Sequence, residues 1–464
     1  MKWLLSLQQQ SNCASIPEIM ASKNVLYEYL FNHETVTRKG QSVTRGNTTS
    51  LFEHYDLSVN GFVPESNEVS LPEVYQEWEQ ACRQLPTLIN NKTLPAVIEQ
   101  LPLMSVEELV SLEQKKHAYL ILCMMGNGYL WMYGRDPQLL PKKLPENIAY
   151  PWFRIAASLG LKPILTHAAV DLYNVVTKAV SVKDVNSADD DNSNTPARMT
   201  SDPDELDCRY TLTGTQDEKW FYLIMSAIEI EGSKGVTIIL ELLLAVKDKD
   251  DEKITEQLQL LANNIKAVEV ILKRTLEKSE DGSYKCDPKI FWNQLRIYLG
   301  GTADPSLFPD GLEFESSGGS MQRNQGGSAA QSSLIQLYDA VLGVVHVSAH
   351  TRRFLLSMRD YMPQPHRQLL EDMEATSRVR DYVMMRCSNN GSSDNEMMLA
   401  FEACINSLTN FRKYHYYIVQ RYIIDNLPEE AKKSATGTGG TSLTGFLLIS
   451  KDETSHSSLS DKDS

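Results

Sequence analysis

The residue best suited to chemistry in this sequence is His415, which lies in a predicted helix over residues 395–425. Apolar residues recur there at three- and four-residue spacing, so His415 falls within the buried stripe. Most histidines in such stripes are core residues with one satisfied hydrogen bond. A buried neutral imidazole is also the ligand that haem iron takes from many proteins. Arg412, one turn earlier, is placed to pair with a carboxylate or a haem propionate.

The other histidines do not form a metal-binding set. His346 and His350 have the i, i+4 spacing of some zinc ligands, but no HExxH pattern surrounds them, and a solvated helix face is the favoured interpretation. His366 follows two prolines at a predicted helix start and is expected to be structural. The seven cysteines contain no CxxC pair, so neither a zinc site nor a disulfide framework is expected.

Two glycine-rich segments interrupt the helical pattern. Residues 326–333 (GGSAAQSS) predict a flexible loop that runs into a helix, with Ser328 as its N-cap. A phosphate cradle is disfavoured because no lysine follows and no strand precedes, but the small residues would let a flat ligand approach the backbone. Residues 437–441 (GTGGT) predict a mobile loop and, on composition alone, a linker.

The elements that must position these residues are predicted to be helices almost throughout. Helical spacing of apolar residues begins near Leu71, strand-like alternation is scarce and no repeat period stands out, so the fold class is all-α. Pro151 is expected to open one helix. From Leu71 onward, helices are expected over residues 71–85, 106–133, 151–178, 217–247, 253–278, 288–299, 328–349, 351–361, 366–386 and 395–425.

An acidic, proline-containing segment over residues 183–207 divides the chain. It carries too little apolar surface to fold alone and is interpreted as a disordered insertion or linker. It separates a small N-terminal domain (51–182) from a large all-α domain (208–449). Residues 1–50 are expected to be a poorly ordered extension, and residues 450–464 a flexible tail.

Charge and composition exclude several classes of partner. The 464 residues carry a net charge of −15, with 42% hydrophobic and 23% charged residues. An acidic surface repels phosphate backbones and anionic lipids, so neither nucleic acid nor membrane is an expected partner. No convincing signal peptide and no bilayer-spanning run is present, which favours the cytoplasm.

Several long segments together resemble indoleamine 2,3-dioxygenases. The resemblance runs from about Leu51 to Leu448, apart from the acidic insertion. It includes LPEVYQEWEQACRQLPTLI and LPENIAYP in the N-terminal domain. The most specific segments are GGSAAQSSLIQLYDAVLG (326–343), MRDYMPQPHR (358–367), FRKYHYYIVQRYI (411–423), FWNQLRIYL (291–299) and TGTGGT (436–441).

This resemblance implies a small helical domain followed by a large helical domain that encloses haem b. It implies an enzyme that inserts both atoms of dioxygen across the C2–C3 bond of the indole of L-tryptophan. The product would be N-formylkynurenine, the first in the kynurenine pathway. L-tryptophan or a related indoleamine and O2 are the expected partners, and the expected state is a monomer.

The resemblance also carries site residues over by position. His415 matches the proximal iron ligand, and Asp339 and Arg412 match the pair that orients the proximal side. Arg296 matches the residue that contacts the substrate carboxylate, for which a planar guanidinium is suited. The other matches are Phe291 at the indole ring, Phe221 in the distal pocket, Gly327, Ser328 and Ala329 over the haem, and Thr438 in a loop that closes over substrate, with Gly437 and Gly439 as its hinge.

Three distal-pocket positions depart from the familiar mammalian pattern. Met225 stands in place of a serine, His167 in place of a tyrosine, and Trp292 in place of a phenylalanine. His167 would either hydrogen-bond dioxygen or fill space. Because the family resemblance includes molluscan myoglobins, the alternative function is an oxygen-binding or haem-sensing protein. A third hypothesis, a haem-independent signalling role of the acidic insertion and the serine-rich tail, is disfavoured because both are typical of solvated segments.

Overall fold

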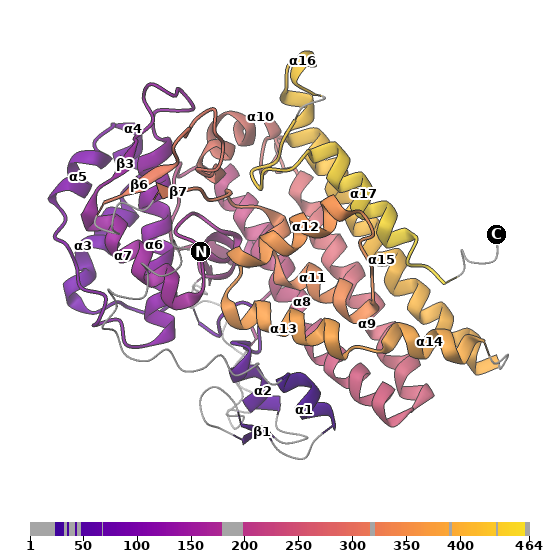
Figure 1. Cartoon of the computed structure of the whole chain (residues 1–464). Coiled ribbons are helices and arrows are strands. Elements are labelled where there is room, and N and C mark those ends of the chain that lie inside the picture. Colours follow the sequence, from indigo (N-terminus) through magenta and orange to yellow (C-terminus); the bar gives the residue numbers. More distant parts are fainter. Residues whose placement is uncertain are drawn as a thin grey trace, which may run out of the picture.

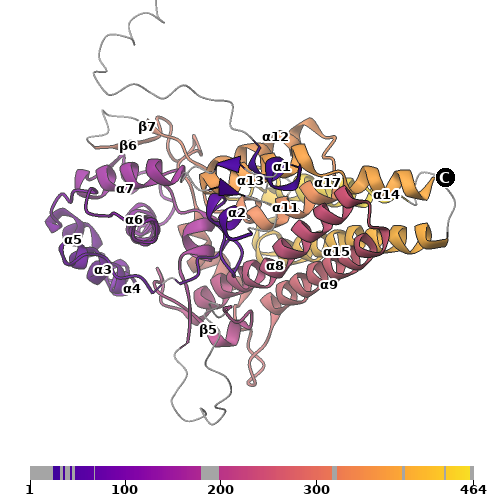
Figure 2. The same ribbon diagram turned by 90° about the horizontal axis from the view of Figure 1, so that it is seen from below.

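The all-α prediction is confirmed by a computed structural model of the chain (Figures 1 and 2). Long helices dominate, and the strands of the described residues form three sheets of two or three short strands each. The structure describes residues 24–31, 35–36, 42–43, 48–66, 68–178, 198–315, 321–388, 392–432 and 435–459.

The small N-terminal unit is built around one central helix, α6 (Leu112–Trp131), which the other helices of the unit surround (Figure 2). Ser111 starts α6 in a capping box with Gln114. Every residue from Ala118 to Met125 is fully buried, as expected for a helix covered on all sides. The surrounding helices are α3 (Gln76–Arg83), α4 (Leu85–Asn90), α5 (Leu94–Gln100) and α7 (Glu146–Leu159).

Three long helices lie side by side in the large unit (Figure 2): α8 (Gln216–Asp248), α9 (Asp251–Lys273) and α15 (Ser392–Tyr422). Lys249 ends α8 in the left-handed conformation, and the Asp250 side chain at once caps α9, so the two helices run antiparallel. Shorter helices cover this layer: α11 (Ser333–Leu342), α12 (Ala349–Met358), α13 (Gln364–Thr376), α14 (Val379–Cys387) and α17 (Leu443–Ser455).

The remaining elements are short. The helices are α1 (Val25–Phe31), α2 (Thr48–His54), α10 (Pro288–Ile290) and α16 (Glu429–Lys432). Two π-helical turns are η2 (Ala168–Leu172) and η5 (Phe291–Leu295). The 3₁₀ turns are η1 (Glu73–Tyr75), η3 (Pro203–Glu205), η4 (Arg274–Leu276), η6 (Arg296–Leu299), η7 (Ala329–Gln331), η8 (Arg359–Tyr361) and η9 (Ile424–Asn426).

The short sheets link segments that are distant in sequence. β1 (Thr35–Val36) pairs with β2 (Ser42–Val43), and β4 (Val175–Thr177) pairs antiparallel with β5 (Leu206–Cys208). In the third sheet, β3 (Lys143–Leu144) of the small unit pairs in parallel with β6 (Leu312–Phe314) of the large unit, and β6 pairs antiparallel with β7 (Met321–Gln322). The two units therefore share a sheet and are not separated by a clean boundary.

The predicted helix over residues 151–178 is wrong at both ends. α7 begins at Glu146, and Pro151 lies inside it. A proline there removes one backbone hydrogen bond, a loss that the packing of a largely apolar helix outweighs. Gly160 then ends α7 with φ +69°, where an added Cβ would lie 2.5 Å from the Gln364 Cβ. The predicted helix over 328–349 likewise ends early, at Gly343, which is left-handed with φ +64°.

Two predictions of disorder are corrected in part. Within residues 1–50, α1 is ordered against α13, with Leu26 fully buried and the Asn24 Nδ2 2.9 Å from the Thr376 Oγ1. Within the acidic insertion, residues 198–207 form η3 and part of β5, because Arg274 pairs with Asp202 and Asp204. Other residues of both segments lie outside the described part of the chain.

The predicted flexible tail from Ser450 is also wrong for the residues described. α17 continues to Ser455, and Thr454 is fully buried. Its polar side chains are buried because they are hydrogen-bonded: the Thr454 hydroxyl donates to the Ser450 carbonyl at 2.8 Å and accepts from Arg412 at 2.6 Å. A composition typical of a solvated tail is therefore compatible with a packed helix. Residues 460–464 lie outside the described part of the chain.

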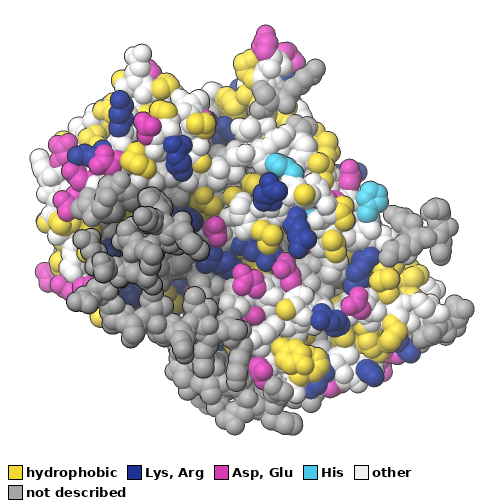
Figure 3. Space-filling model, in the orientation of Figure 1, with side chains coloured by type: hydrophobic (Ala, Val, Ile, Leu, Met, Phe, Trp, Pro, Cys, Tyr) yellow, Lys and Arg dark blue, Asp and Glu magenta, His cyan; other side chains and the backbone are white. Residues whose placement is uncertain are grey.

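Acidic and basic side chains are interspersed on the face of the molecule shown in Figure 3. The described residues visible on that face form no continuous basic patch of the kind that binds nucleic acid. No helix within the described ranges is both long enough and apolar enough to cross a bilayer.

The close packing of α8 against α11 depends on a glycine, and this gives a first prediction. A Cβ on Gly232 would lie 2.1 Å from the Leu334 Cδ2, well inside van der Waals contact. We expect Gly232→Ala to lower the free energy of unfolding by about 1–3 kcal/mol through overpacking. Gly445→Ala, also helical but with only ordinary contacts around its Cβ, is the matched control and is expected to be neutral or slightly stabilising. Urea denaturation midpoints measure both, and equal midpoints would show that the contact is not tight.

Candidate functional site

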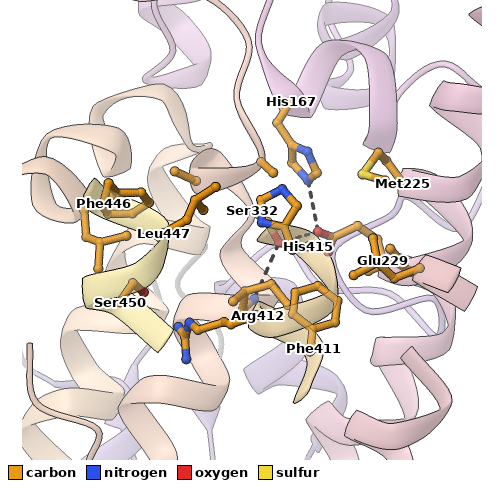
Figure 4. Close-up of a pocket in the computed structure, with 16 residues that line it drawn as sticks. His167, Met225, Glu229, Ser332, Phe411, Arg412, His415, Phe446, Leu447 and Ser450 are labelled. Atoms are coloured by element: carbon orange, nitrogen blue, oxygen red, sulfur yellow. Dashed lines mark hydrogen bonds and ion pairs between the residues drawn. The ribbon is translucent and has the colours of Figure 1, made fainter. Parts of the chain in front are cut away.

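A cavity lies between α8, α15, α17 and the segment 327–332, and we call it the inner cavity (Figure 4). It has two adjoining lobes. The aromatic lobe is lined by Phe221, Phe291, Arg296 and the 437–441 loop. The polar lobe is lined by His167, Glu229, Ser332 and Arg412. Both lobes are lined by Met225, Leu272, Ala329, Ala330, His415, Phe446 and Leu447.

His415 projects from α15 into this cavity (Figure 4). Burial, followed by the charge of Arg412, lowers the pKa of His415 to about 4, so its imidazole is neutral at pH 7. Among the described residues, no hydrogen bond or ion pair engages the ring. A core histidine normally has at least one such partner. His415 is therefore a neutral imidazole with both ring nitrogens available, on the wall of a large and mainly apolar cavity.

Arg412 and Asp339 form a buried ion pair behind this histidine. The Arg412 Nη2 lies 2.6 Å from the Asp339 Oδ2, and each side chain is about 10% exposed. Burial raises the pKa of Asp339, but the charges of Arg412 and His346 outweigh burial and bring this pKa below its ordinary value. Arg412 lines the polar lobe, whereas Asp339 lies behind it and lines neither lobe. The two residues that the family resemblance pairs are thus in contact.

The predicted solvated helix face is wrong for His346 and confirmed for His350, which is exposed on α12. Because Gly343 ends α11, His346 lies in the following loop, where it is 9% exposed and within 2.8 Å of Glu453 and 3.3 Å of Asp339. His350 lies in the next helix, α12, with its Nε2 3.0 Å from the Thr441 Oγ1. Sequence reasoning missed His346 and Glu453 because their partners are distant in the chain.

The aromatic lobe holds two phenylalanines in contact. The rings of Phe221 and Phe291 are 4.8 Å apart at 45°, and Tyr422 packs edge-on against Phe291 at 5.3 Å. Phe291 begins the π-helical turn η5, a distortion that is frequent at functional sites. Trp292, one residue later, lines neither lobe but lines an adjoining hollow, so its place in the distal pocket stays a prediction. Successive residues of a helical turn project in different directions, so Trp292 does not follow Phe291 into the lobe.

Arg296 stands where the aromatic lobe meets solvent. Its Nη2 donates to the Thr436 carbonyl at 2.9 Å, and its guanidinium lies 4.9 Å from the centre of the Trp292 ring. Its Nε is buried without a hydrogen-bond partner among the described residues. Burial and then the charge of Arg135 lower the pKa of Arg296 to about 10, which leaves it charged at neutral pH. The site thus offers a cation with unused hydrogen-bonding capacity.

The 437–441 loop is closed over the aromatic lobe. The Thr438 hydroxyl donates to the Gly327 carbonyl at 2.5 Å, and the Gly326 N–H donates to the Thr438 carbonyl at 2.9 Å. Gly439 sits so tightly that a Cβ would lie 3.1 Å from the Phe354 ring. Gly440 has φ +84° and needs to be glycine for conformational reasons. Ser328, as predicted, caps a helical turn by accepting from the Ala330 N–H at 3.3 Å.

His167 is fixed between two carboxylates at the end of the polar lobe (Figure 4). Its Nδ1 lies 2.7 Å from Asp171, and its Nε2 2.9 Å from Glu229. Burial alone would lower the pKa of His167, but the two carboxylates raise it to about 10. The Ser332 hydroxyl also donates to Glu229, at 2.5 Å. His167 is therefore a buried imidazolium, and both ring nitrogens already donate.

The sequence predicted His167 but missed its partners. Asp171 follows His167 at the i, i+4 spacing, a pattern that local reasoning has the means to find. Glu229 follows Met225 at the same spacing on α8, and Met225 lines both lobes. Glu229 was missed because its histidine lies in the other unit, 62 residues away.

The donor set of the inner cavity fits haem better than a bare metal ion. Within the described ranges, no group of three or more histidine, cysteine or acidic side chains is arranged to hold a metal. A single imidazole holds a bare ion poorly, whereas in haem the porphyrin supplies four ligands and the protein needs to add only one. The apolar walls at Leu272, Phe411, Phe446 and Leu447 suit the flat hydrophobic ring.

Comparisons with known proteins agree with this assignment. The sequence profile of the indoleamine 2,3-dioxygenase family matches residues 51–457. Mouse indoleamine 2,3-dioxygenase 1 is 31% identical over 431 residues, which cover 90% of this chain and 98% of the mouse protein. An indoleamine 2,3-dioxygenase of Saccharomyces cerevisiae is 31% identical, covering 82% and 87% of the two chains. A protein of Haliotis diversicolor named myoglobin is 29% identical, covering 85% and 95%.

The family profile spans both structural units and the residues that line the inner cavity. The chain therefore belongs to the indoleamine 2,3-dioxygenase family, a family of haem-dependent oxidoreductases.

Proposed function

We propose that this protein is a haem b dioxygenase that inserts both atoms of O2 across the C2–C3 bond of the indole of L-tryptophan. The product is N-formylkynurenine. The observation that carries the proposal is one lobe that combines a neutral imidazole without a partner among the described residues, a pair of packed phenylalanines and a charged arginine at its mouth. An indole ring with a carboxylate on its side chain has the matching chemistry.

His415 is the residue that binds the iron from the protein side. Its neutral ring offers a nitrogen lone pair, and the low pKa means that no proton competes for it at pH 7. The Arg412–Asp339 pair fixes the turn of α15 that carries it. When bound, the haem iron supplies the site at which dioxygen is held and activated.

The aromatic lobe holds the substrate in position. Phe221 and Phe291 provide an apolar surface for the indole ring. Arg296 binds the α-carboxylate, because its Nε has no other partner in the described part of the chain and its planar fork suits a carboxylate. Thr438, in the closed loop, excludes water from the lobe and must move for substrate to enter and product to leave. These residues position the ring and perform no acid–base step.

The second candidate is an oxygen-binding protein on the same fold, and the resemblance to the abalone myoglobin favours it. A carrier has no need of an aromatic lobe with an arginine at its mouth, which is why we rank it second. The two functions differ in product. A reduced protein that binds O2 stably beside L-tryptophan and forms no N-formylkynurenine is the carrier.

His415→Ala is expected to lose most of its haem, because the protein ligand to iron is removed. The Soret absorbance per chain of the purified variant measures this. His456→Ala, which removes an exposed histidine at the end of α17, is the control and should keep full haem content. Added imidazole should restore part of the Soret band of His415→Ala if the cavity is intact. Full haem with an unchanged Soret band in His415→Ala would contradict the assignment.

Arg296→Gln is expected to raise the KM for L-tryptophan about 10- to 100-fold, the usual effect of losing a charge-assisted hydrogen bond. Haem content should stay the same, because Arg296 does not hold the cofactor. Tryptamine, which has the indole and the amine but no carboxylate, is the control substrate, and its binding should change little. An equal loss for both ligands would show that Arg296 acts on the shape of the lobe and not on the carboxylate.

The pKa of His167 gives a pH-dependent prediction. Because its folded value is about 10 and its ordinary value 6.5, its contribution to stability is fully present below pH 6.5 and is lost as the pH rises toward 10. The destabilisation caused by His167→Gln should therefore be largest at pH 6 and smaller at pH 9.

His366 gives the opposite trend, because burial lowers its pKa to about 4. The destabilisation caused by His366→Gln should become smaller as the pH falls from 6.5 toward 4. Urea titrations at several pH values test both, and a pH-independent gap for His167→Gln would refute the buried imidazolium.

A further inference from the structure

A second hollow lies outside the 437–441 loop, and we call it the outer hollow. It shares Arg296, Ile423, Gly437 and Thr438 with the aromatic lobe, so the side chains of Arg296 and Ile423 and the loop form the wall between the two spaces. Any substrate that enters the inner cavity past this loop first crosses the outer hollow. Its lining is more polar than that of the inner cavity and includes one residue that the proposed function leaves unused, Arg135.

The fold presents Arg135 at the rim of this hollow. α6 ends at Trp131, and Gly134, with φ +86°, turns the chain back, its N–H donating to the Trp131 carbonyl at 2.9 Å. The Trp131 indole N–H donates to the Gly300 carbonyl at 3.2 Å, which attaches the end of α6 to the wall of the hollow. The Arg135 guanidinium lies 5.8 Å from the centre of the Trp131 ring. Its position is thus set by the end of a buried helix.

Among the described residues, the charged groups that line the outer hollow are the guanidiniums of Arg135 and Arg296 and the carboxylate of Asp304, an excess of one positive charge. Asp304 neutralises Arg135 only weakly, because the pair is 3.9 Å apart and each side chain is more than 40% exposed. Arg296 donates to a neutral carbonyl and keeps its Nε without a partner among the described residues. The chain as a whole has a net charge of −15 and repels anions, so a locally cationic site attracts an anion to this one place.

The two arginines also repel each other. The charge of Arg135 adds to burial in lowering the pKa of Arg296, so the two guanidiniums are close enough to interact. An anion between them would relieve this repulsion and use the free Nε. A carboxylate suits both groups, since each guanidinium presents a planar fork of donors.

We propose that Arg135 and Arg296 make the outer hollow a capture site for the α-carboxylate of the incoming amino acid. Arg135 holds the carboxylate at the rim while the loop is closed, and Arg296 takes it over as the side chain passes into the aromatic lobe. The identity of that amino acid, L-tryptophan, rests on the proposed function. The site itself requires only a small ligand that carries a carboxylate.

The test compares Arg135→Gln with the parent, both as haem-loaded full-length protein. L-tryptophan and tryptamine are titrated while the Soret band is followed, and the rate of association is measured by stopped flow. We expect Arg135→Gln to weaken L-tryptophan binding about fivefold, mainly through slower association, and to leave tryptamine binding unchanged. The difference should fade in 0.5 M salt, because an exposed charge is screened there. Asp304→Asn should have the opposite effect, because it removes the one anion in the hollow.

Arg154→Gln is the matched control. Arg154 is 52% exposed and pairs with Glu107 at 3.7 Å, close to the 47% and 3.9 Å of Arg135, but it lies on α7 and lines neither the hollow nor the inner cavity. Equal weakening of tryptophan binding in Arg154→Gln, equal weakening of tryptamine binding in Arg135→Gln, or no change in Arg135→Gln would each overturn the capture site. A parent that binds L-tryptophan without oxidising it refutes the proposed function, and the binding comparison still decides the inference.

Discussion

The structure of the site depends on the buried ion pair between Arg412 and Asp339. Two charges that have been removed from water must stay together, because losing one partner leaves the other unpaired at a cost of about 3–5 kcal/mol. This pair joins α15 to α11, and the second amino group of Arg412 reaches Thr454 on α17. The three helices carry His415, the continuation of the 326–332 segment, and Phe446 with Leu447. The side chain of Arg412 thus holds α11, α15 and α17, which form three walls of the inner cavity, in position relative to one another.

The opposite end of the cavity is fixed by a second buried cluster with different parts. His167 comes from the small unit, whereas Glu229 and Ser332 come from the large one. An imidazolium between two carboxylates is stable in a buried place only if all three groups stay in contact. The cluster therefore holds the two units together at the cavity, as the β3–β6 pair does further away. His346 bridges Asp339 and Glu453 beside the Arg412 ion pair, as His167 bridges Asp171 and Glu229 in the second cluster. Neither of these two histidines is free to bind iron. In the proposed function that role is left to His415.

The sequence predicted features that depend on local pattern and missed those that depend on distant partners. The apolar stripe of α15 was enough to predict that His415 faces the interior, where it lines the inner cavity, and the serine cap before Ala330 followed from composition. The surroundings of His346 were predicted wrongly because no residue near it in the sequence indicates its contact with Glu453, which lies 107 residues away. The tail after Ser450 was predicted to be solvated because it is rich in polar residues. Composition does not reveal that buried hydroxyls of such residues form hydrogen bonds within the protein. Trp292 was assigned by alignment with a pocket residue, although its direction is set by the π-helical turn that Phe291 begins.

Hydrogen bonds couple Arg296 to the 437–441 loop, so that a movement of the loop changes the partners of the arginine. Thr436, at the base of the loop, accepts from the Arg296 guanidinium, and Thr438, two residues later, donates to the Gly327 carbonyl over the cavity. If the loop lifts together with Thr436, it breaks the bond to Gly327 and removes the Thr436 carbonyl from Arg296 at the same time. The arginine then has more unsatisfied donors, and its attraction for an anion at the mouth increases just as the way in opens. When the loop closes again, one of those donors returns to Thr436, and the remaining ones are those that, in the proposed function, orient the substrate carboxylate. The stack on Trp292 keeps the guanidinium plane in place throughout, so the loop changes the hydrogen bonds of the arginine without changing its position.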